Sequence, residues 1–497
     1  MKKFILLFLL LPGSFVWAQP GSLDVTFGQS GVVLQSFIPT RDGFGEMAIA
    51  ADSSIYVMGN SNFTYDFLLA KFTSSGVLDS SFSEDGWLLL DYAGSTDQGK
   101  AIAIQDDGKI LLGGGVVVAN RDWGVVRVSA QGVPDSTFGE NGWAVFDWGG
   151  FDEVYDIVVQ PDGKILVSGG GNFNFALARL EATGVLDSTF GVNGRVSYTS
   201  GGTAMIALAA DGSVLCADGF DNGLNTQYGV IKFTDLGQID DSFGDNGIFL
   251  SDVTNIAGEP FIALQAGGEI VFGGTLYNNQ GSATGVALAR ILSNGSPDLS
   301  FSGDGKTIVN SGGDAQDIGL LPNGHILIAG SATPNGNADM ALYCFRSDGT
   351  LENTFGTNGT ATVHIGGLGE WAYSLAIQPD GKIILGGNHY DNYNLIALVR
   401  LEGGELTNGI GSQINPYHFE LFPNPTYGQV HIRSGQVFSE VVQITLIDIS
   451  GKKLWSSELL PGYLDKEITF PEDLPAGLYR IAFIINGKMQ AQALMIR

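Results

Sequence analysis

The feature that most constrains the fold is a phrase of the form Leu-Asp-x-Thr-Phe-Gly, which occurs seven times. Its phenylalanines are between 52 residues (138 to 190) and 58 residues (243 to 301) apart, and stand at Phe27, Phe82, Phe138, Phe190, Phe243, Phe301 and Phe355. Two further phrases, clearest at 160–166 and 175–180, recur with the same period. Such a period is typical of arrays in which each unit buries apolar surface against the next one.

Each unit of the array predicts four short strands. In the third unit we expect them at 154–160, 164–168, 175–180 and 195–199, with a tight turn at 161–163. The first three strands are almost continuously apolar, which indicates burial on both faces, whereas the fourth alternates and has one face toward water. Four strands in about 50 residues are typical of a blade of a β-propeller.

The order of strands along the chain predicts how the ring closes. One lone strand of the fourth type (31–38) precedes six complete units, and the last unit (371–401) has only three strands. We therefore expect an all-β, seven-bladed propeller whose last blade is completed by the N-terminal strand. An open solenoid is the alternative, but it would leave the matched strand and blade unpaired and expose sheet edges.

The two ends of the chain have a different texture. Residues 1–18 are typical of a signal peptide, with Lys2 and Lys3 before an apolar run, and no later segment is apolar enough to span a membrane. The propeller is expected at 19–401 and a linker at 402–417. Residues 418–497 predict seven short strands of a small β-sandwich. The two cysteines, Cys216 and Cys344, lie in apolar strands and are expected as buried thiols.

Two families are recognisable in these motifs. Leu-Asp-Ser-Thr-Phe-Gly (186–191), Gln-Pro-Asp-Gly-Lys-Ile-Leu (160–166) and Phe-Ala-Leu-Ala-Arg-Leu (175–180) resemble the bacterial delta-60 repeat, a β-propeller family without a general assigned activity. The segments 421–426, 448–452 and 474–479 resemble the type A sorting domain of the type IX secretion system. That resemblance rests on Pro423, Asn424, Pro425, Gly451 and Gly477.

The second resemblance implies a route of export. It implies that the secretion machinery is a partner and that the protein passes the outer membrane of a Bacteroidetes-type bacterium. It also implies that the protein is secreted or held at the outer cell surface, with cleavage in the 402–417 linker.

The net charge of the chain narrows the classes of ligand that it can bind. The chain has 24 lysines and arginines against 52 acids, a formal net charge of −28. Nucleic acids and anionic lipids need basic surfaces, so neither is expected as a partner. Cations, neutral ligands such as sugars, and other proteins remain.

No catalytic constellation is visible. The five histidines form no zinc-binding pair, and neither a nucleophile elbow nor a phosphate-binding loop is present. One acid recurs per unit, and we interpret it as a turn residue that pairs with an Arg or Lys between blades. These acids are Asp24, Asp79, Asp135, Asp187, Asp240, Asp298 and Glu352.

Loops that depart from the repeat are the candidate ligand site. The loops between second and third strands and those between blades should share one face of the disc, where function is usually found. The candidates are Asn120, Asp122, Trp123, Asp152, Glu153, Glu370, Trp371, His389, Tyr390 and Asp391.

The residue types at this face suggest what it could bind. Amides and carboxylates can bond sugar hydroxyls and rings can stack on sugar faces, while converging acids would suit Ca²⁺. No cofactor is expected unless it is Ca²⁺. Because no catalytic constellation is visible, we favour the interpretation of a non-enzymatic module that binds a glycan or a protein. The alternatives are a polysaccharide hydrolase or lyase with carboxylates at this face, or a structural part of the surface layer.

Overall fold

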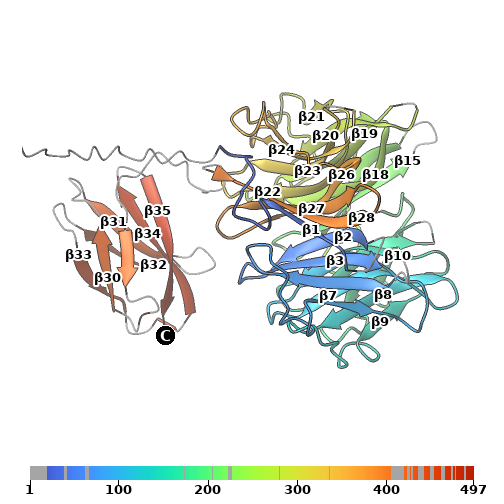
Figure 1. Ribbon diagram of the computed structural model, residues 1–497, viewed down its shortest axis with the longest axis horizontal. Helices are drawn as coiled ribbons and strands as arrows, with labels where there is room; N and C mark the ends of the chain where they lie inside the picture. The colour runs from blue at the N-terminus through green and yellow to red at the C-terminus, as the bar shows by residue number, and fades with distance from the viewer. Residues whose placement is uncertain are drawn as a thin grey trace, which may run out of the picture. The chain divides into compact units, whose positions relative to one another are not determined.

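The computed structural model divides the chain into two units, residues 1–407 and 408–497 (Figure 1). In the first unit the structure describes residues 19–37, 42–61, 66–172, 174–203, 205–221, 226–278, 280–334 and 336–404. In the second unit it describes residues 419–422, 426, 429–434, 441–447, 453–459, 465–471, 474–475, 477–485 and 488–496. The predicted signal peptide (1–18) lies outside these residues, as does nearly all of the predicted linker.

The first unit is a seven-bladed β-propeller of four-stranded antiparallel sheets, as predicted. The innermost strands are β2 (Asp42–Ile49), β6 (Gln98–Ile104), β10 (Glu153–Val159), β14 (Met205–Leu208), β18 (Ile256–Leu264), β22 (Ala315–Leu320) and β26 (Gly369–Ile377). The second strands are β3 (Ile55–Ser61), β7 (Ile110–Val117), β11 (Ile165–Gly171), β15 (Val214–Asp221), β19 (Ile270–Tyr277), β23 (Ile326–Ala332) and β27 (Ile383–Tyr390).

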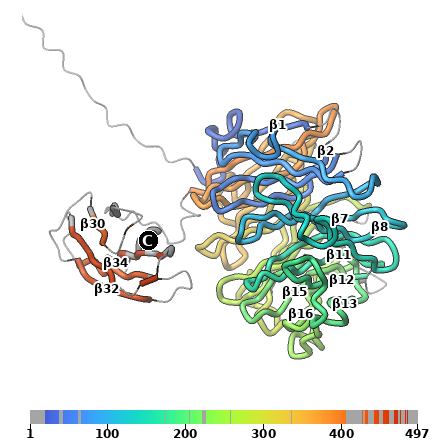
Figure 2. Tube along the Cα trace, turned by 90° about the horizontal axis from the view of Figure 1, so that it is seen from below, coloured from blue at the N-terminus to red at the C-terminus, as the bar shows by residue number. Residues whose placement is uncertain are grey.

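The outer half of each blade follows the same order. The third strands are β4 (Phe67–Phe72), β8 (Arg121–Val128), β12 (Asn174–Leu180), β16 (Thr226–Phe233), β20 (Ala283–Ile291), β24 (Asp339–Phe345) and β28 (Asn394–Leu401). The outermost strands are β5 (Trp87–Leu90), β9 (Trp143–Phe146), β13 (Arg195–Tyr198), β17 (Ile248–Thr254), β21 (Lys306–Val309), β25 (Thr360–Val363) and, in the last blade, β1 (Val32–Gln35). Consecutive blades follow one another around the ring (Figure 2).

The ring closes through the N-terminus, as the strand order predicted. Strand β1 pairs with β28 in the register Val32↔Val399 to Gln35↔Ile396, so the blue strand lies beside the orange ones in Figure 1. Phe27 and Val33 are buried in a core that includes residues of both the first and the last blade. The hydrophobic core of the propeller therefore lies between neighbouring blades, and closure removes the free sheet edges.

The disc of the propeller has two faces, which carry different loops. The loop face carries the loops between second and third strands and the connections between blades. The hairpin face carries the turns between first and second strands and the loops between third and fourth strands. At the hairpin face Gly163 has φ of +85°, a left-handed conformation that glycine adopts at little cost.

The repeated acid at the hairpin face is a turn residue, as predicted. The Asp187 Oδ1 atom accepts the Thr189 N–H at 3.0 Å. Its Oδ2 atom pairs with Arg179 Nε at 2.7 Å, and Arg179 Nη1 donates to the carbonyl oxygen of Asp235 in the next blade.

The prediction that this ion pair joins two blades is corrected by the structure. The acid follows its Arg by eight residues in a chain that folds straight back, so both belong to one blade. The guanidinium instead reaches the next blade through a carbonyl. The same pair recurs as Lys71–Asp79, Arg127–Asp135, Lys232–Asp240, Arg290–Asp298 and Arg400–Asp24, and as Arg346–Glu352 in the sixth blade.

The second unit consists of two packed sheets. Its strands are β29 (Phe419–Phe422), β30 (Gln429–Ser434), β31 (Val442–Ile447), β32 (Lys453–Leu459), β33 (Asp465–Thr469), β34 (Gly477–Ile485) and β35 (Lys488–Ile496). One sheet has the order β29-β30-β33 and the other β32-β31-β34-β35. Val430 and Ile432 of the first sheet share a core with Ile444 and Phe483 of the second, which confirms a β-sandwich.

Candidate functional site

Six of the seven innermost strands share an irregularity within a few residues of their loop-face end. There the ladder to the second strand skips a residue, so one residue bulges out of the pairing. A bulge of this kind re-aims the extra side chain away from its regular place in the sheet. The bulged residues are Gly45, Lys100, Tyr155, Gln316 and Tyr373, and in β18 the longer segment 258–260.

All of these bulged residues line a single cavity of about 360 Å³. Its other lining residues include Phe44, Glu46, Asn60, Met205 and Asp317, so every blade contributes to its wall. Because the innermost strands surround the propeller axis, the cavity lies on that axis, toward the loop face. The volume falls in the range of about 300–1,000 Å³ that is usual for small-molecule sites.

One lysine crosses the cavity. Lys100 of the second blade places its Nζ atom 2.7 Å from Glu259 Oε1 of the fifth blade. The same ammonium group lies 4.2 Å from the centroid of the Tyr155 ring and 4.0 Å from Glu153 Oε2. Burial works against its charge, but the carboxylates of Glu259 and Glu153 outweigh burial and raise the pKa of Lys100.

Three acids occupy the repeat position after the bulge, namely Glu46, Asp156 and Asp317. Each accepts a hydrogen bond from the backbone N–H of the next blade's innermost strand. These bonds run from Ile102 to Glu46 Oε2 (2.8 Å), from Ile206 to Asp156 Oδ2 (2.9 Å) and from Leu375 to Asp317 Oδ2 (2.7 Å). They join neighbouring blades near the axis.

Burial changes the acidity of these three groups. It raises the pKa of Asp156 and of Asp317 to about 6. Burial and the neighbouring charges of Asp156, Asp317 and Glu259 raise the pKa of Glu46 well above its ordinary value. Two of these groups, Glu46 and Asp317, line the cavity, so its wall contains carboxyl groups that hold their protons more tightly than usual.

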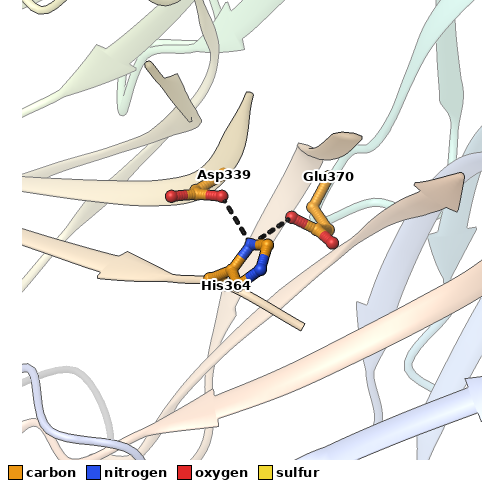
Figure 3. A group of neighbouring side chains, drawn as sticks. All are labelled: Asp339, His364 and Glu370. Carbon is orange, nitrogen blue, oxygen red and sulfur yellow. Dashed lines mark hydrogen bonds and ion pairs between the residues drawn. The ribbon is translucent and has the colours of Figure 1, made fainter. Parts of the chain in front are cut away.

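A second kind of polar cluster lies at the loop face, where one blade meets the next. Figure 3 shows Asp339 at the start of β24, His364 just after β25 and Glu370 in β26. The His364 Nδ1 atom lies 2.9 Å from Asp339 Oδ1 and 3.4 Å from Glu370 Oε2. The hydrogen bond to Asp339 and the charge of Glu370 raise the pKa of His364. On the other side, His389 Nδ1 lies 3.2 Å from Glu370 Oε1.

The same three repeat positions hold acids at two other junctions. Asp122, Asp147 and Asp152 meet between the second and third blades, and Asp66, Asp91 and Asp97 between the first and second. In each group, one possible ligand atom from every residue lies within 4.8 Å of the others.

The residues predicted as a ligand site from the sequence thus divide among several places. Asp122 and Asp152 share one junction, and Glu370 and His389 share another. Glu153 faces the cavity region, where its Oε1 atom lies 3.2 Å from Arg121 Nη2.

The remaining predicted residues have other places. Asn120 Nδ2 donates to the Gly150 carbonyl oxygen at 2.6 Å and thereby shapes a loop. Tyr390 and Asp391 are exposed at the end of β27, and Trp371 is half-buried in β26. Trp123 is fully buried: it packs on Trp148 with centroids 5.0 Å apart and donates from Nε1 to the Gly170 carbonyl oxygen. It belongs to the core rather than to the loop face, because the third strand is covered on both sides.

The sorting-domain residues are placed only in part. Pro423, Asn424, Pro425 and Gly451 lie outside the described residues, and Gly477 begins β34. Both cysteines are buried free thiols, as predicted.

The cavity residues Lys100, Tyr155, Glu46 and Glu259 were not predicted as site residues. A signal for some of them exists in the sequence, since Lys100, Glu46 and Asp156 are charged residues inside otherwise apolar first strands. What the sequence does not show is the bulge that turns them toward one axis.

Comparisons with known proteins agree with the fold. Residues 50–82, 105–138, 160–190, 265–301, 321–355 and 378–403 match the DUF5122 β-propeller domain, a domain of unknown function. Residues 420–497 match the secretion system C-terminal sorting domain. No curated protein sequence matches the chain.

Solved structures with a similar fold share little sequence. PorZ, a surface component of the type IX secretion system of Porphyromonas gingivalis, is 13% identical with a TM-score of 0.44. That match covers 92% of this chain and 59% of PorZ. Virginiamycin B lyase from Staphylococcus aureus is 11% identical with a TM-score of 0.43, over 74% of this chain and 98% of the lyase. Drosophila semaphorin 1b is 9% identical with a TM-score of 0.38, over 77% of this chain and 88% of that chain.

The fold and the cavity define a β-propeller with one polar site on its axis. More particularly, the chain carries DUF5122 β-propeller repeats, which are delta-60-like, followed by a C-terminal secretion-system sorting domain. The sorting domain indicates export by the type IX secretion system to the cell surface or the medium. In the part of the chain that the structure describes, no helix has the length and apolar character to cross a membrane.

Proposed function

We propose that the exported propeller is a non-enzymatic binding module that takes a sugar unit of a glycan into its axial cavity. The single observation that carries this proposal is the identity of the bulged residues. Five blades present Gly45, Lys100, Tyr155, Gln316 and Tyr373 at one equivalent position. Positions with the same structural task keep one residue type around this ring, whereas this position holds a glycine, a cation, two phenols and an amide.

The second argument is the chemistry of the wall. The rings of Tyr155, Tyr373 and Phe44 can cover the apolar face of a sugar, since aromatic side chains bury large areas in fixed geometries. Glu46, Asp317, Asn60 and Gln316 add oxygen and nitrogen atoms that can bond hydroxyl groups. A few placed polar groups in a wall with aromatic rings are typical of small-ligand sites.

Charge selects among sugars. The cavity wall holds the carboxyl groups of Glu46, Glu259 and Asp317 and the ammonium group of Lys100, while Glu153 nearby pairs with Arg121. Such a wall repels phosphorylated or sulfated sugars and favours neutral or amino sugars. Protonated carboxyl groups with raised pKa values can also donate a hydrogen bond to a sugar oxygen.

The test is a glycan array with the secreted full-length chain, followed by titration of the best ligand. We expect selective binding to one class of neutral or amino sugar. Tyr155→Ala should weaken binding at least tenfold, because a ring in contact with ligand is usually worth more than about 1.4 kcal/mol. Tyr155→Phe keeps the ring and should retain most of the affinity.

The matched control is Tyr393→Ala, which removes an exposed tyrosine that does not line the cavity. Unchanged affinity in Tyr155→Ala, or equal loss in both variants, would contradict binding at the axis. An array without any bound glycan would contradict a sugar ligand and direct the search to proteins.

A specific observation also supports a polysaccharide-acting enzyme. Glu46 and Asp317 both line the cavity, and carboxyl groups with a raised pKa are suited to donate a proton to a leaving group. Against this, Glu46 and Asp317 each accept a hydrogen bond from a backbone N–H of the next blade, as Asp156 does. Such bonds are expected of side chains that join neighbouring blades. Incubating each bound glycan with the protein and analysing the products by chromatography decides between the two, and Asp317→Asn should abolish any cleavage.

A further inference from the structure

The three loop-face junctions described above have the same backbone geometry but different charge. At the junction of the sixth and seventh blades, His364 lies between Asp339 and Glu370 and can carry a positive charge that both acids share (Figure 3). At the junction of the second and third blades, the position of His364 is held by Asp147. The acids on either side, Asp122 and Asp152, remain.

We propose that the junction of the second and third blades binds Ca²⁺ through the carboxylates of Asp122, Asp147 and Asp152. The junction of the first and second blades, with Asp66, Asp91 and Asp97, binds a second Ca²⁺ in the same way. In both places the metal ion supplies the charge that a histidine supplies between the sixth and seventh blades. This proposal does not rest on the sugar-binding function.

The first support is a buried carboxylate without a hydrogen bond. Asp122 is only 4% exposed, and its Oδ1 atom is inaccessible and has no partner among the described residues. Burial and the charges of Asp147 and Asp152 raise the pKa of Asp122. A buried charge that is neither paired nor hydrogen-bonded is costly, so such a group points to a missing cation.

The second support is that the site is held in place. Asp152 is fully buried, and its two oxygens accept the N–H groups of Trp148 (2.6 Å) and Asn172 (2.8 Å). Asp147 accepts the N–H of Gly149 at 2.6 Å and is exposed, which leaves one side open to water. The acids thus stand on β8, after β9 and before β10, on a rigid frame.

Nearby cations of the protein are already engaged elsewhere. The guanidinium of Arg121 reaches Gln98 and Glu153 at the cavity side. Arg195 donates to the backbone carbonyl oxygen of Asp147, not to its carboxylate. Among the described residues no salt bridge involves Asp122, Asp147 or Asp152.

The donor atoms select the metal. Ca²⁺ takes six to eight oxygen ligands at about 2.3–2.6 Å, so two ligands on opposite sides of the ion are up to roughly 5 Å apart. One carboxylate oxygen from each of the three residues lies within 4.8 Å of the other two, which fits that span. The group contains no thiolate or imidazole, which zinc would prefer, and waters at the open side can complete the shell.

The first neighbouring junction provides a parallel case. Asp97 is fully buried and its Oδ1 atom has no partner among the described residues, while its Oδ2 atom accepts the Tyr92 N–H at 2.6 Å. Burial raises the pKa of Asp97 to about 6. The two junctions share the triad of repeat positions, and each contains one buried carboxylate oxygen without a partner among the described residues, on Asp122 of the third strand in one junction and on Asp97 before the first strand in the other. They therefore predict two ions per chain.

The experiment exchanges the residue that distinguishes the junctions. The full chain is freed of metal with a chelator, and CaCl₂ binding is measured by equilibrium dialysis and by calorimetric titration. We expect two Ca²⁺ per chain in the unaltered protein, one in Asp147→His, one in Asp91→His and none in the double variant. Asp122→Asn, which is isosteric, should also reduce the number by one.

The chain offers a matched control. Asp252 occupies the same position in the fourth blade but pairs with Lys306 and belongs to no acidic triad, so Asp252→His should still bind two ions. In the opposite direction, His364→Asp should create a third site between the sixth and seventh blades.

Two results would overturn the proposal. One is no Ca²⁺ bound at about 10 mM, which exceeds the dissociation constants of weak extracellular sites. The other is a stoichiometry that Asp147→His and Asp122→Asn leave unchanged. An equal loss in Asp252→His would also overturn it, because the effect would then come from net charge alone.

Discussion

The hairpin face and the loop face of the propeller treat acidic residues in opposite ways. At the hairpin face each repeated acid has a cation of the same blade beside it, as Asp187 has Arg179 and Lys164. Toward the loop face and along the axis, Asp122 is buried and Asp156 and Asp317 are partly buried, and none of the three has a cation beside it among the described residues. Charges balanced within the repeat belong to the scaffold, whereas the unbalanced ones include the acids on which our two binding proposals rest.

The pKa values of these acids show the same contrast between the hairpin face and the axis. Although burial opposes it, Lys164, Thr189 and Arg179 hold the pKa of Asp187 well below its ordinary range. Hydrogen bonds from Thr137 and the charge of Arg127 lower the pKa of Asp135 to about 2. At the axis, burial raises the pKa of Asp156 and of Asp317 to about 6. The two regions should therefore respond oppositely to substitution and to pH.

The largest expected effect tests the closure on which both regions depend. Deleting residues 19–38 removes β1, the buried Phe27 ring and the partner of Arg400, Asp24. We expect a loss on the order of 5 kcal/mol or more in the free energy of unfolding, from a lost core aromatic and a broken buried ion pair. Urea denaturation followed by tryptophan fluorescence measures it, and an unchanged midpoint would refute closure through the N-terminus.

A smaller effect tests the balanced acids. Arg179→Met leaves Asp187 with Lys164 alone, and breaking a buried pair typically costs about 3–5 kcal/mol, so we expect a loss near the lower end. Arg346→Met is the comparison, because Arg346 is half-exposed and its loss should matter much less. Equal shifts of the urea midpoint in both variants would show that the hairpin-face pairs are not the scaffold elements described above.

The smallest expected effect tests the unbalanced acids by pH. The folded protein holds the Asp156 proton up to about pH 6, whereas an unfolded chain releases it near pH 4. Between these values the folded state binds more protons, so this group's contribution to stability falls as pH rises. Asp156→Asn keeps an oxygen for the Ile206 N–H and should be about 1–2 kcal/mol more stable at pH 8, with a flatter profile between pH 4 and 6.

Asp187→Asn is the matched comparison, because we expect it to change stability at neutral pH in the opposite direction to Asp156→Asn. The lowered pKa of Asp187 gives stability above pH 4 that is lost as pH falls below it. The variant should therefore be less stable than the unaltered protein at pH 7 and should converge with it in acid. If both variants shift stability in the same direction at neutral pH, the division into balanced and unbalanced acids does not hold.

Much of the scaffold could be predicted from the sequence because its causes are local. A turn at 161–163 and an apolar run at 175–180 each depend on neighbours within one blade, and each recurs seven times. The lone strand before the first complete unit and the three strands of the last one sufficed to predict the pairing of β1 with β28. In the sandwich the seven predicted strands are observed, as β29 to β35.

The site was predicted less well because its causes are not local. Asp152, Asp122, Glu370 and His389 were identified as loop-face residues, but their partners Asp147 and His364 were not placed with them. Trp123 is of a residue type that often binds ligands, but it lies in the core, where the Trp148 ring packs against it. Lys100 was not predicted as a site residue and is the cation that lines the axial cavity.

The sequence by itself determined the blades, their number, the closing strand and the sandwich, because period, turn residues and apolar alternation act over a few residues. Only the tertiary structure decided which side chains meet. Five equivalent bulges point into one cavity because the ring brings the innermost strands to a common axis. The acidic triads form because a strand start, a strand end and the next blade's first strand converge at one junction. Local interactions fix a blade, but the electrostatic environment of an acid depends on charges that only the closed ring brings together.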